Sequence, residues 1–297
     1  MSKHGDTVAA HSSPKSSQQQ SVSIRVVGAG TVGRATGTVL AEWGHAVTFV
    51  DVDESVRDEL EADGYQTAAP TSSIDADVVL ISVPTPYDPE VGRYSLEYVE
   101  AAVETIAEQN YEGVVAIRST VSPGTTERLA KQHDLNHVAM VPEFLFADRA
   151  TQDVRDATEL IIGSNSEHAR ETLRTVFEPE RTAIITLTPT EAEFAKLASN
   201  CFGATKISFA NELWSTVRSF SEMTDAQVDA QRALSAFRMI CPWHSADMGL
   251  EGGRPYGGAC LPKDTQGLHG WAEDTGVEMP TLGGVIETNK MMQRDDY

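Results

Sequence analysis

The chain has 297 residues and a formal net charge of −21 at pH 7, a length that allows two domains with substantial hydrophobic cores. So acidic a surface repels nucleic acid and anionic lipid headgroups, and we therefore expect neither nucleic acid nor a membrane as a partner. The same charge fits a halophilic protein in a salt-rich cytoplasm and also an ordinary acidic protein.

The N-terminal tail and the cysteines indicate the compartment. Residues 1–20 are polar, low in complexity and without the apolar centre of a signal peptide, so we expect a disordered tail. Three cysteines, at positions 201, 241 and 260, have no paired spacing, which is typical of a reducing environment. No apolar run reaches the length of a membrane span. We therefore expect a soluble, cytoplasmic protein.

The first chemical motif is a glycine-rich turn between a predicted strand at 22–27 and a predicted helix at 31–43. Its G-x-G-x-x-G spacing suits a dinucleotide phosphate, which the free amides of the helix N-terminus would bind. A second predicted strand, 47–50, ends in Asp51. The predicted cofactor contacts of the turn are Gly28, Gly30, Thr31, Val32 and Gly33.

Each part of this motif has a physical reason. Gly28 permits a tight turn, Gly30 lets a pyrophosphate approach the backbone, and Gly33 lets the helix pack on the strand. Asp51 would accept hydrogen bonds from the adenosine ribose, and its charge disfavours a 2′-phosphate, so we predict NAD rather than NADP. A glycine turn in an unrelated α/β protein is the alternative at this point.

Strands and helices keep alternating up to residue 188. The predicted strands are 77–83, 114–118, 137–141, 159–162 and 183–187, with a helix at 94–109. This alternation predicts a doubly wound parallel, Rossmann-like sheet, in which ligands gather at the carboxyl ends of the strands. Thr85, Thr120 and Glu143 each follow such an end. Taken singly, they could be a turn residue, a cap and a surface carboxylate.

From residue 189 onward the pattern is helical, and we predict domains at 21–188 and 189–297. A long helix is expected at 191–221, and further helices at 225–240, up to 272 and at 282–293. In the long helix Glu193, Lys196 and Asn200 share one face through their i+3 and i+4 spacing. This polar stripe indicates either a helix that lines a wet cleft or a solvated face with a local ion pair.

The most distinctive stretch is 256–264, YGGACLPKD. A reactive thiol needs an open backbone, a cation that favours thiolate, and a base. Beside Cys260, Lys263 could lower the thiol pKa and Asp264 could move protons. The alternative is a turn with an inert, buried cysteine. The C-x-x-H unit at 241–244 has no second half, so we expect no metal there.

In order and spacing, the motifs GAGTVG, VPTP, STVSPGTT, PEFL, EFAKLASNCFGATKISFANE and YGGACLPKD resemble those of the UDP-glucose/GDP-mannose dehydrogenase family. The resemblance implies oxidation of the C6 alcohol of a nucleotide sugar to a carboxylate with NAD, for surface glycans or protein glycosylation. The residues implied as catalytic are Cys260, Lys196, Asn200, Asp264, Glu143 and Thr120. The implied cofactor contacts outside the glycine turn are Asp51, Thr85, Thr120 and Lys263.

The resemblance also assigns roles and exposes departures. Cys260 resembles the nucleophile, while Lys196, Asn200 and Asp264 resemble groups that handle the oxyanion and the catalytic water. Thr120 and Glu143 resemble residues that serve the nicotinamide side and thioester hydrolysis. Ala147 stands where many members carry a second acidic residue after PEFL, and whether the neighbouring Asp148 compensates is left open at this point. Two further departures are Pro255, where a glycine is usual, and Ala259, where a serine is common.

The length of the chain is the largest departure from the resembled family, whose members continue into a third domain that binds the nucleotide. We expect a homodimer, possibly completed by a separate chain that supplies this domain. Three hypotheses follow: a nucleotide-sugar dehydrogenase, a weakly catalytic NAD-binding subunit or regulator, and a dehydrogenase that oxidises a smaller alcohol once. The NADH formed per sugar distinguishes them.

Overall fold

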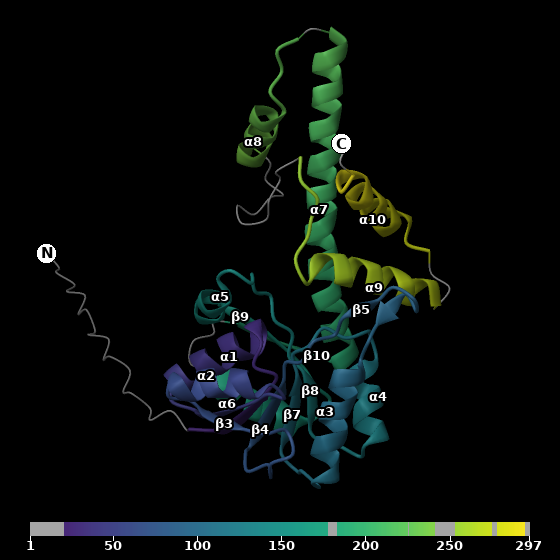
Figure 1. Ribbon diagram of the computed structural model, residues 1–297. Helices are drawn as coiled ribbons and strands as arrows, with labels where there is room; N and C mark the ends of the chain where they lie inside the picture. Colours follow the sequence, from purple (N-terminus) through teal and green to yellow (C-terminus); the bar gives the residue numbers. More distant parts are fainter. Residues whose placement is uncertain (1–20, 178–182, 225, 241–252, 275–277, 295–297) are drawn as a thin grey trace, which may run out of the picture.

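The computed structural model describes residues 21–177, 183–224, 226–240, 253–274 and 278–294. The predicted disordered tail and the C-x-x-H unit lie outside these residues. Figure 1 shows two regions, a sheet covered by helices and a helical region arranged around one long helix, α7. Within the described part of the chain, no helix is long and apolar enough to cross a membrane.

The sheet has eight strands in the order β10-β9-β8-β7-β4-β1-β2-β3. The strands are β1 (Ser23–Val27), β2 (Ala46–Val50), β3 (Gln66–Ala68), β4 (Val78–Ile81), β7 (Val114–Ile117), β8 (Val138–Met140), β9 (Glu159–Gly163) and β10 (Ala183–Leu187). Every residue of the central strands β4 and β7 is buried. Helices cover both faces there, which explains why VVLI and VVAI are apolar without interruption.

Two apolar cores form, one on each face of the sheet. One contains Leu40, Leu60 and Leu173, and the other contains Val103 and Leu129. Helices α1 (Thr31–Glu42), α2 (Glu54–Ala62) and α6 (Glu167–Phe177) contribute to the first core, and α3 (Glu97–Glu108) and α4 (Thr125–Gln132) to the second. Helix α5 (Ala150–Asp156) packs on α1 in a smaller cluster. Helices on both faces of a mostly parallel sheet confirm the predicted doubly wound fold.

The last two strands depart from the predicted parallel pattern. β9 pairs antiparallel with β8, with Met140 opposite Gly163, and β10 runs parallel to β9. A parallel pair requires a crossover that returns the chain to the edge where the first strand began. The connection between β8 and β9 contains only the seven-residue α5, which packs against α1. The chain therefore re-enters the sheet from the edge that it left.

The helical region consists of α7 (Pro189–Thr224), α8 (Ala230–Ile240), α9 (Leu261–Asp274) and α10 (Pro280–Met292). The first turns of α7 pack against β8, β9 and α4, and the rest extends beyond the sheet (Figure 1). The long predicted helix is therefore present. Because α7 contacts both regions, the proposed division between residues 188 and 189 stays a prediction.

A small hairpin connects the two regions. It is formed by β5 (Tyr87–Asp88) and β6 (Arg93–Tyr94), follows β4, and contacts α9. The predicted helix at 94–109 is correct only from Glu97 onward, because Tyr94 belongs to β6. Asp and Gly are turn-forming residues, and both occur between the two strands of the hairpin or at its ends. In the structure Asp88 accepts a hydrogen bond from the amide of Glu90 at 2.8 Å, and Gly92 has φ +75°.

Candidate active site

The glycine turn has the geometry that its spacing predicts. Gly28 has φ +89°, and a Cβ at this position would lie 2.6 Å from the carbonyl oxygen of Ser82. A Cβ at Gly33 would lie 1.8 Å from the oxygen of Gly28, so only glycine lets α1 approach the turn this closely. By contrast, no heavy atom lies within 4 Å of a Cβ built at Gly30. The backbone of Gly30 is therefore open to a ligand.

Asp51 is tied to this turn. Its carboxylate accepts a hydrogen bond from the amide of Ala29 at 2.8 Å and another from the amide of Asp53 at 3.0 Å. Carboxylate oxygens have further lone pairs, so both contacts leave room for ribose hydroxyls. The backbone thus fixes the carboxylate in place at the end of β2.

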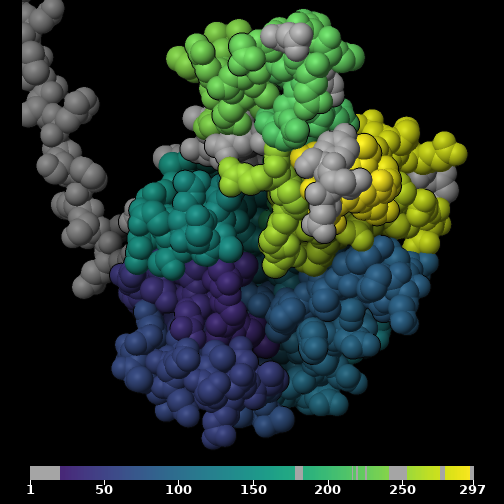
Figure 2. Space-filling view, turned by 45° about the horizontal axis from the view of Figure 1, so that its top comes forward, coloured from purple at the N-terminus to yellow at the C-terminus, as the bar shows by residue number. Residues whose placement is uncertain are grey.

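A groove of about 600 Å³ runs between the glycine turn and α5. Gly30 and Thr31 line one side, while Ala147, Asp148 and Arg149 line the other. Figure 2 shows the purple and teal surfaces of these segments facing the yellow-green start of α9 across a hollow. Asp148 therefore lies beside the predicted cofactor site, together with the Ala147 position that lacks an acidic side chain.

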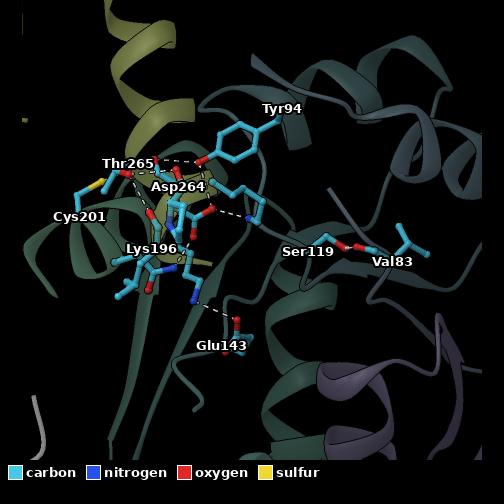
Figure 3. A network of polar contacts seen from close by, with 12 residues as sticks. Val83, Tyr94, Ser119, Glu143, Lys196, Cys201, Asp264 and Thr265 are labelled. Atoms are coloured by element: carbon cyan, nitrogen blue, oxygen red, sulfur yellow. Dashed lines mark hydrogen bonds and ion pairs between the residues drawn. The ribbon is translucent and has the colours of Figure 1, made fainter. Parts of the chain in front are cut away.

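The three residues predicted at the sheet edge are all buried, namely Thr85, Thr120 and Glu143. They follow β4, β7 and β8, which are neighbours in the sheet and run parallel. Burial excludes the alternative that Glu143 is a surface carboxylate. Nearby, the hydroxyl of Ser119 donates to the carbonyl of Val83 at 2.7 Å and joins the loops after β7 and β4 (Figure 3).

Glu143 forms an ion pair with Lys196 of α7, with 3.0 Å between Oε1 and Nζ and side chains only 7% and 3% exposed. Its other oxygen accepts from the amide of Leu145 at 2.7 Å. Burial opposes ionisation of this carboxyl, but Lys196, the Leu145 amide and Arg118 outweigh it, so the pKa of Glu143 is lowered. The pair joins the two regions as a buried, charged contact (Figure 3).

The polar stripe of α7 faces inward along its length. Lys196 reaches Glu143, and Asn200 Nδ2 donates to Asp264. Glu193 is fully buried and accepts from the amides of Gly124 at 2.6 Å and Thr126 at 2.8 Å, so it caps the start of α4. A solvated face is therefore excluded, and the stripe divides into a structural part and a part that belongs to the site.

Asp264 is the centre of the cluster on α9. It is fully buried, and its two oxygens accept from Lys263 Nζ, Asn200 Nδ2 and the hydroxyl of Tyr94. Figure 3 shows Tyr94 reaching Asp264, with the Glu143–Lys196 pair beside them. The helix begins directly after Cys260, whose carbonyl accepts from the amide of Asp264 at 2.8 Å.

Cys260 is exposed, which contradicts the alternative of a buried, inert cysteine at this position. Gly258 beside it has φ +78°, and a Cβ at Gly257 or Gly258 would meet nothing within 4 Å. The backbone around the thiol is therefore open. The inert cysteine is instead Cys201, where burial and then the charge of Asp264 raise the thiol pKa to about 12.

The expected lowering of the thiol pKa at Cys260 is wrong in its net direction. Lost hydration, which is the largest cause, raises the pKa of Cys260 although the residue retains exposed surface. Lys263 and Lys196 lower it, while Asp264 and Glu143 raise it. Lys263 therefore acts in the expected sense, but its effect is offset by the carboxylate with which it pairs.

Sequence reasoning missed Tyr94, Arg118 and Thr265. Tyr94 is buried against α9 and bonds to Asp264, Arg118 lowers the pKa of Glu143, and Thr265 lies 3.4 Å from the hydroxyl of Tyr256. None of them belongs to a motif with a spacing of its own. Their roles depend on contacts between residues far apart in the sequence.

The fold and the site together define a dinucleotide-dependent oxidoreductase. A glycine turn, a carboxylate at the end of the next strand, and an exposed thiol beside two lysines and two buried carboxylates meet at the carboxyl edge of a doubly wound sheet. Comparison with known proteins makes this class more specific.

Two sequence profiles of the UDP-glucose/GDP-mannose dehydrogenase family match the chain, the NAD binding domain over residues 59–181 and the central domain over residues 190–291. The UDP-glucose 6-dehydrogenase YwqF of Bacillus subtilis is 32% identical, over 92% of this chain and 67% of the relative. The chain therefore belongs to this family, and its cofactor is NAD.

Other relatives agree with this assignment. The UDP-glucose 6-dehydrogenase AglM of Haloferax volcanii is 29% identical over 90% of this chain and 69% of the relative. The structure of a UDP-glucose dehydrogenase from Pyrobaculum islandicum superposes with a TM-score of 0.80 at 28% identity, covering 94% of this chain and 70% of that one. The chain spans about two thirds of the length of the curated relatives that it matches, from 62% to 69%.

Proposed function

We propose that the protein oxidises the C6 alcohol of a nucleotide sugar of the UDP-glucose kind to the uronic acid, with Cys260 as covalent nucleophile. The observation that carries this proposal is the position of the thiol. It is exposed at the start of α9, and its pKa responds to Lys196, Lys263, Asp264 and Glu143 together. A thiol, two ammonium groups, an amide and carboxylates form the minimal set for two oxidations followed by hydrolysis.

The residues present fit NAD. Gly30 leaves its backbone open, α1 begins at Thr31 with free amides for the pyrophosphate, and Asp51 stands ready for the ribose. Thr85, Thr120 and Lys263 are the further proposed contacts. Bound NAD would supply the hydride acceptor for both oxidations. Two NAD molecules are used per sugar, because each NAD accepts one hydride.

The residues of the chain would do the remaining chemistry. After the alcohol has lost a hydride and a proton, the Cys260 thiolate forms a bond to the aldehyde carbon and gives a thiohemiacetal. Lys196 Nζ and Asn200 Nδ2 donate to its oxyanion. Loss of a second hydride leaves a thioester, which water attacks while Glu143 accepts a proton, and the thiolate leaves. One alcohol, two NAD and one water thus give one carboxylate, two NADH and three protons.

Counting NADH per sugar tests the proposal. Purified protein is given limiting UDP-glucose, GDP-mannose or UDP-N-acetylmannosamine with excess NAD, at low and at molar salt. Two NADH per sugar support the proposal. One NADH indicates a dehydrogenase that oxidises once, and none with retained NAD binding indicates an NAD-binding subunit or regulator.

Cysteine variants sharpen the assay. Cys260→Ala should abolish the formation of two NADH and of the acid, because no thioester can form. Cys201→Ala, at the buried cysteine, is the matched control and should keep the stoichiometry of two. If Cys260→Ala still formed the uronic acid, covalent catalysis would be excluded.

The setting of the reaction also belongs to the proposal. The product would serve as a precursor for surface glycans or protein glycosylation, in a salt-rich cytoplasm that screens the net charge of −21. A homodimer, or a separate chain carrying a nucleotide-binding domain, would cover the exposed apolar side chains of α7 and α8, which include Phe202, Phe220, Met223 and Met239. Light scattering on the purified protein tests the dimer.

A further inference from the structure

The hairpin after β4 inserts one aromatic side chain into the catalytic cluster. Tyr94 is only 7% exposed, and its hydroxyl lies 3.2 Å from Asp264 Oδ1 and 3.2 Å from the backbone oxygen of Asp264. Figure 3 shows the ring reaching Asp264 from the side opposite Cys201. The residue follows Thr85 by only nine positions, so the strand end at the cofactor edge leads directly into this contact.

Helix α9 is shaped to receive the hairpin. A Cβ at Gly267 would lie 2.2 Å from Cζ of Tyr94, and a Cβ at Gly270 would lie 2.2 Å from the oxygen of Gly92. The Lys263 ammonium lies 5.1 Å from the centre of the Tyr94 ring, at cation–π distance. At the far end of α9, Arg93 pairs with Asp274 at 2.6 Å. The hairpin is thus docked along one face of the helix.

Three donors fix the Asp264 carboxylate, and they come from different parts of the chain. Asn200 belongs to α7, Lys263 to α9, and Tyr94 to the hairpin that leaves the sheet. Of these three, Tyr94 is the donor that links the carboxylate to the sheet region, because its hairpin follows strand β4. Burial is the largest cause that raises the pKa of Tyr94, followed by the charge of Asp264, so the phenol stays protonated and acts as a donor.

We propose that Tyr94 is a positioning residue whose hydroxyl holds the Asp264 carboxylate, and with it Lys263 and Asn200, in alignment with the groups at the sheet edge. The expected effect on turnover rests on the proposed function, whereas the contact between Tyr94 and Asp264 is independent of it. Loss of this hydrogen bond leaves the carboxylate held by Lys263 and Asn200 alone, without its donor from the hairpin.

The test is Tyr94→Phe, which keeps the ring on Gly267 and under Lys263 and removes only the hydroxyl. With nucleotide sugar and NAD, kcat should fall about tenfold, a change of about 1.4 kcal/mol in the barrier. The KM values for both substrates should stay within about twofold, because Asp264 orients reacting groups. Tyr98→Phe is the matched control, since Tyr98 is 55% exposed on α3, and should match the wild type.

A second variant and a second readout keep the proposal falsifiable. Gly267→Ala would push the ring away while leaving the hydroxyl in the sequence, and should reproduce the loss in kcat. Hydrogen exchange in the first turns of α9 should be several-fold faster in Tyr94→Phe than in Tyr98→Phe. Wild-type kcat in Tyr94→Phe would overturn the proposal, as would unchanged exchange. A wild type without turnover would overturn the proposed function alone, because exchange still reports the contact.

Discussion

The sheet region and the helical region hold their site groups by different means. In the sheet region, Thr85 and Thr120 follow strands in which every residue is buried, so the backbone of a packed core positions them. In the helical region, α7 and α8 leave large apolar side chains exposed, among them Phe202 and Met239. The core beneath α9 even includes Tyr94, which the sheet region contributes.

What aligns the helical site groups is therefore contact with the sheet. Lys196 pairs with Glu143, and Asp264 accepts from Tyr94, and both contacts cross between the regions. Buried polar contacts are sensitive to the removal of either partner, since the other is left without compensation. We call the buried polar contacts between the sheet region and the helical region the seam. The comparison predicts that substitutions at the seam lower the free energy of unfolding more than substitutions of similar size within the helical region.

The largest effect is expected from Lys196→Met, which leaves the buried carboxyl of Glu143 without its ion-pair partner. Removing one partner of a buried ion pair typically costs about 3–5 kcal/mol of unfolding free energy. Urea unfolding at pH 7 and fixed salt measures it. Lys196→Met with Glu143→Gln should recover much of the loss, because no buried charge then remains. Lys206→Met, farther along α7, should change stability by less than about 1 kcal/mol.

The same pair predicts a change in the sign of a pH effect. In the wild type the pKa of Glu143 is lowered, so its contribution to stability is present above the ordinary value and lost as pH falls through the lowered pKa. Without Lys196 burial dominates, and the pKa should be raised. The deficit of Lys196→Met should therefore shrink between pH 8 and pH 5. A deficit that grew over this range would contradict the assigned pairing.

A smaller effect is expected from Glu193→Ala, at the contact between α7 and α4. The substitution leaves the amides of Gly124 and Thr126 without their buried acceptor, which should cost about 2–3 kcal/mol in urea unfolding. Glu191→Ala removes an exposed carboxylate that accepts from Thr188, and should cost about 1 kcal/mol or less. An equal loss of unfolding free energy in the two variants would show that a buried carboxylate at this contact stabilises the protein no more than an exposed one.

The same contrast explains what the sequence could reveal. The glycine turn, Asp51, and the residues after β4, β7 and β8 follow from local spacing, and the structure places them at one edge. The reversed β9 depends on where a seven-residue helix packs, which periodicity does not encode. Likewise the face shared by Lys196 and Asn200 was predictable, but their buried partners were not.

The thiol shows the limit most clearly, because the pKa of Cys260 is a balance among groups from three segments. Lost hydration raises it, and the charges of Lys263 and Asp264 act on it in opposite directions. Nearest neighbours in the sequence therefore suggested the wrong net direction. Tyr94 was missed for a related reason, since a helical pattern from Glu97 onward concealed a hairpin in front of it.

The smallest predicted effect tests whether Lys263, a residue of the helical region, lowers the pKa of the Cys260 thiol. The alkylation rate of Cys260 by iodoacetamide, followed by peptide mass spectrometry, should have a pH midpoint above the ordinary thiol value. Lys263→Met removes the charge that lowers this pKa most, so alkylation at pH 8 should slow about two- to fivefold. Lys131→Met, exposed on α4, is the matched control and should leave the rate unchanged. Faster alkylation in Lys263→Met would mean that the lysine acts on Cys260 through Asp264 rather than through its own charge.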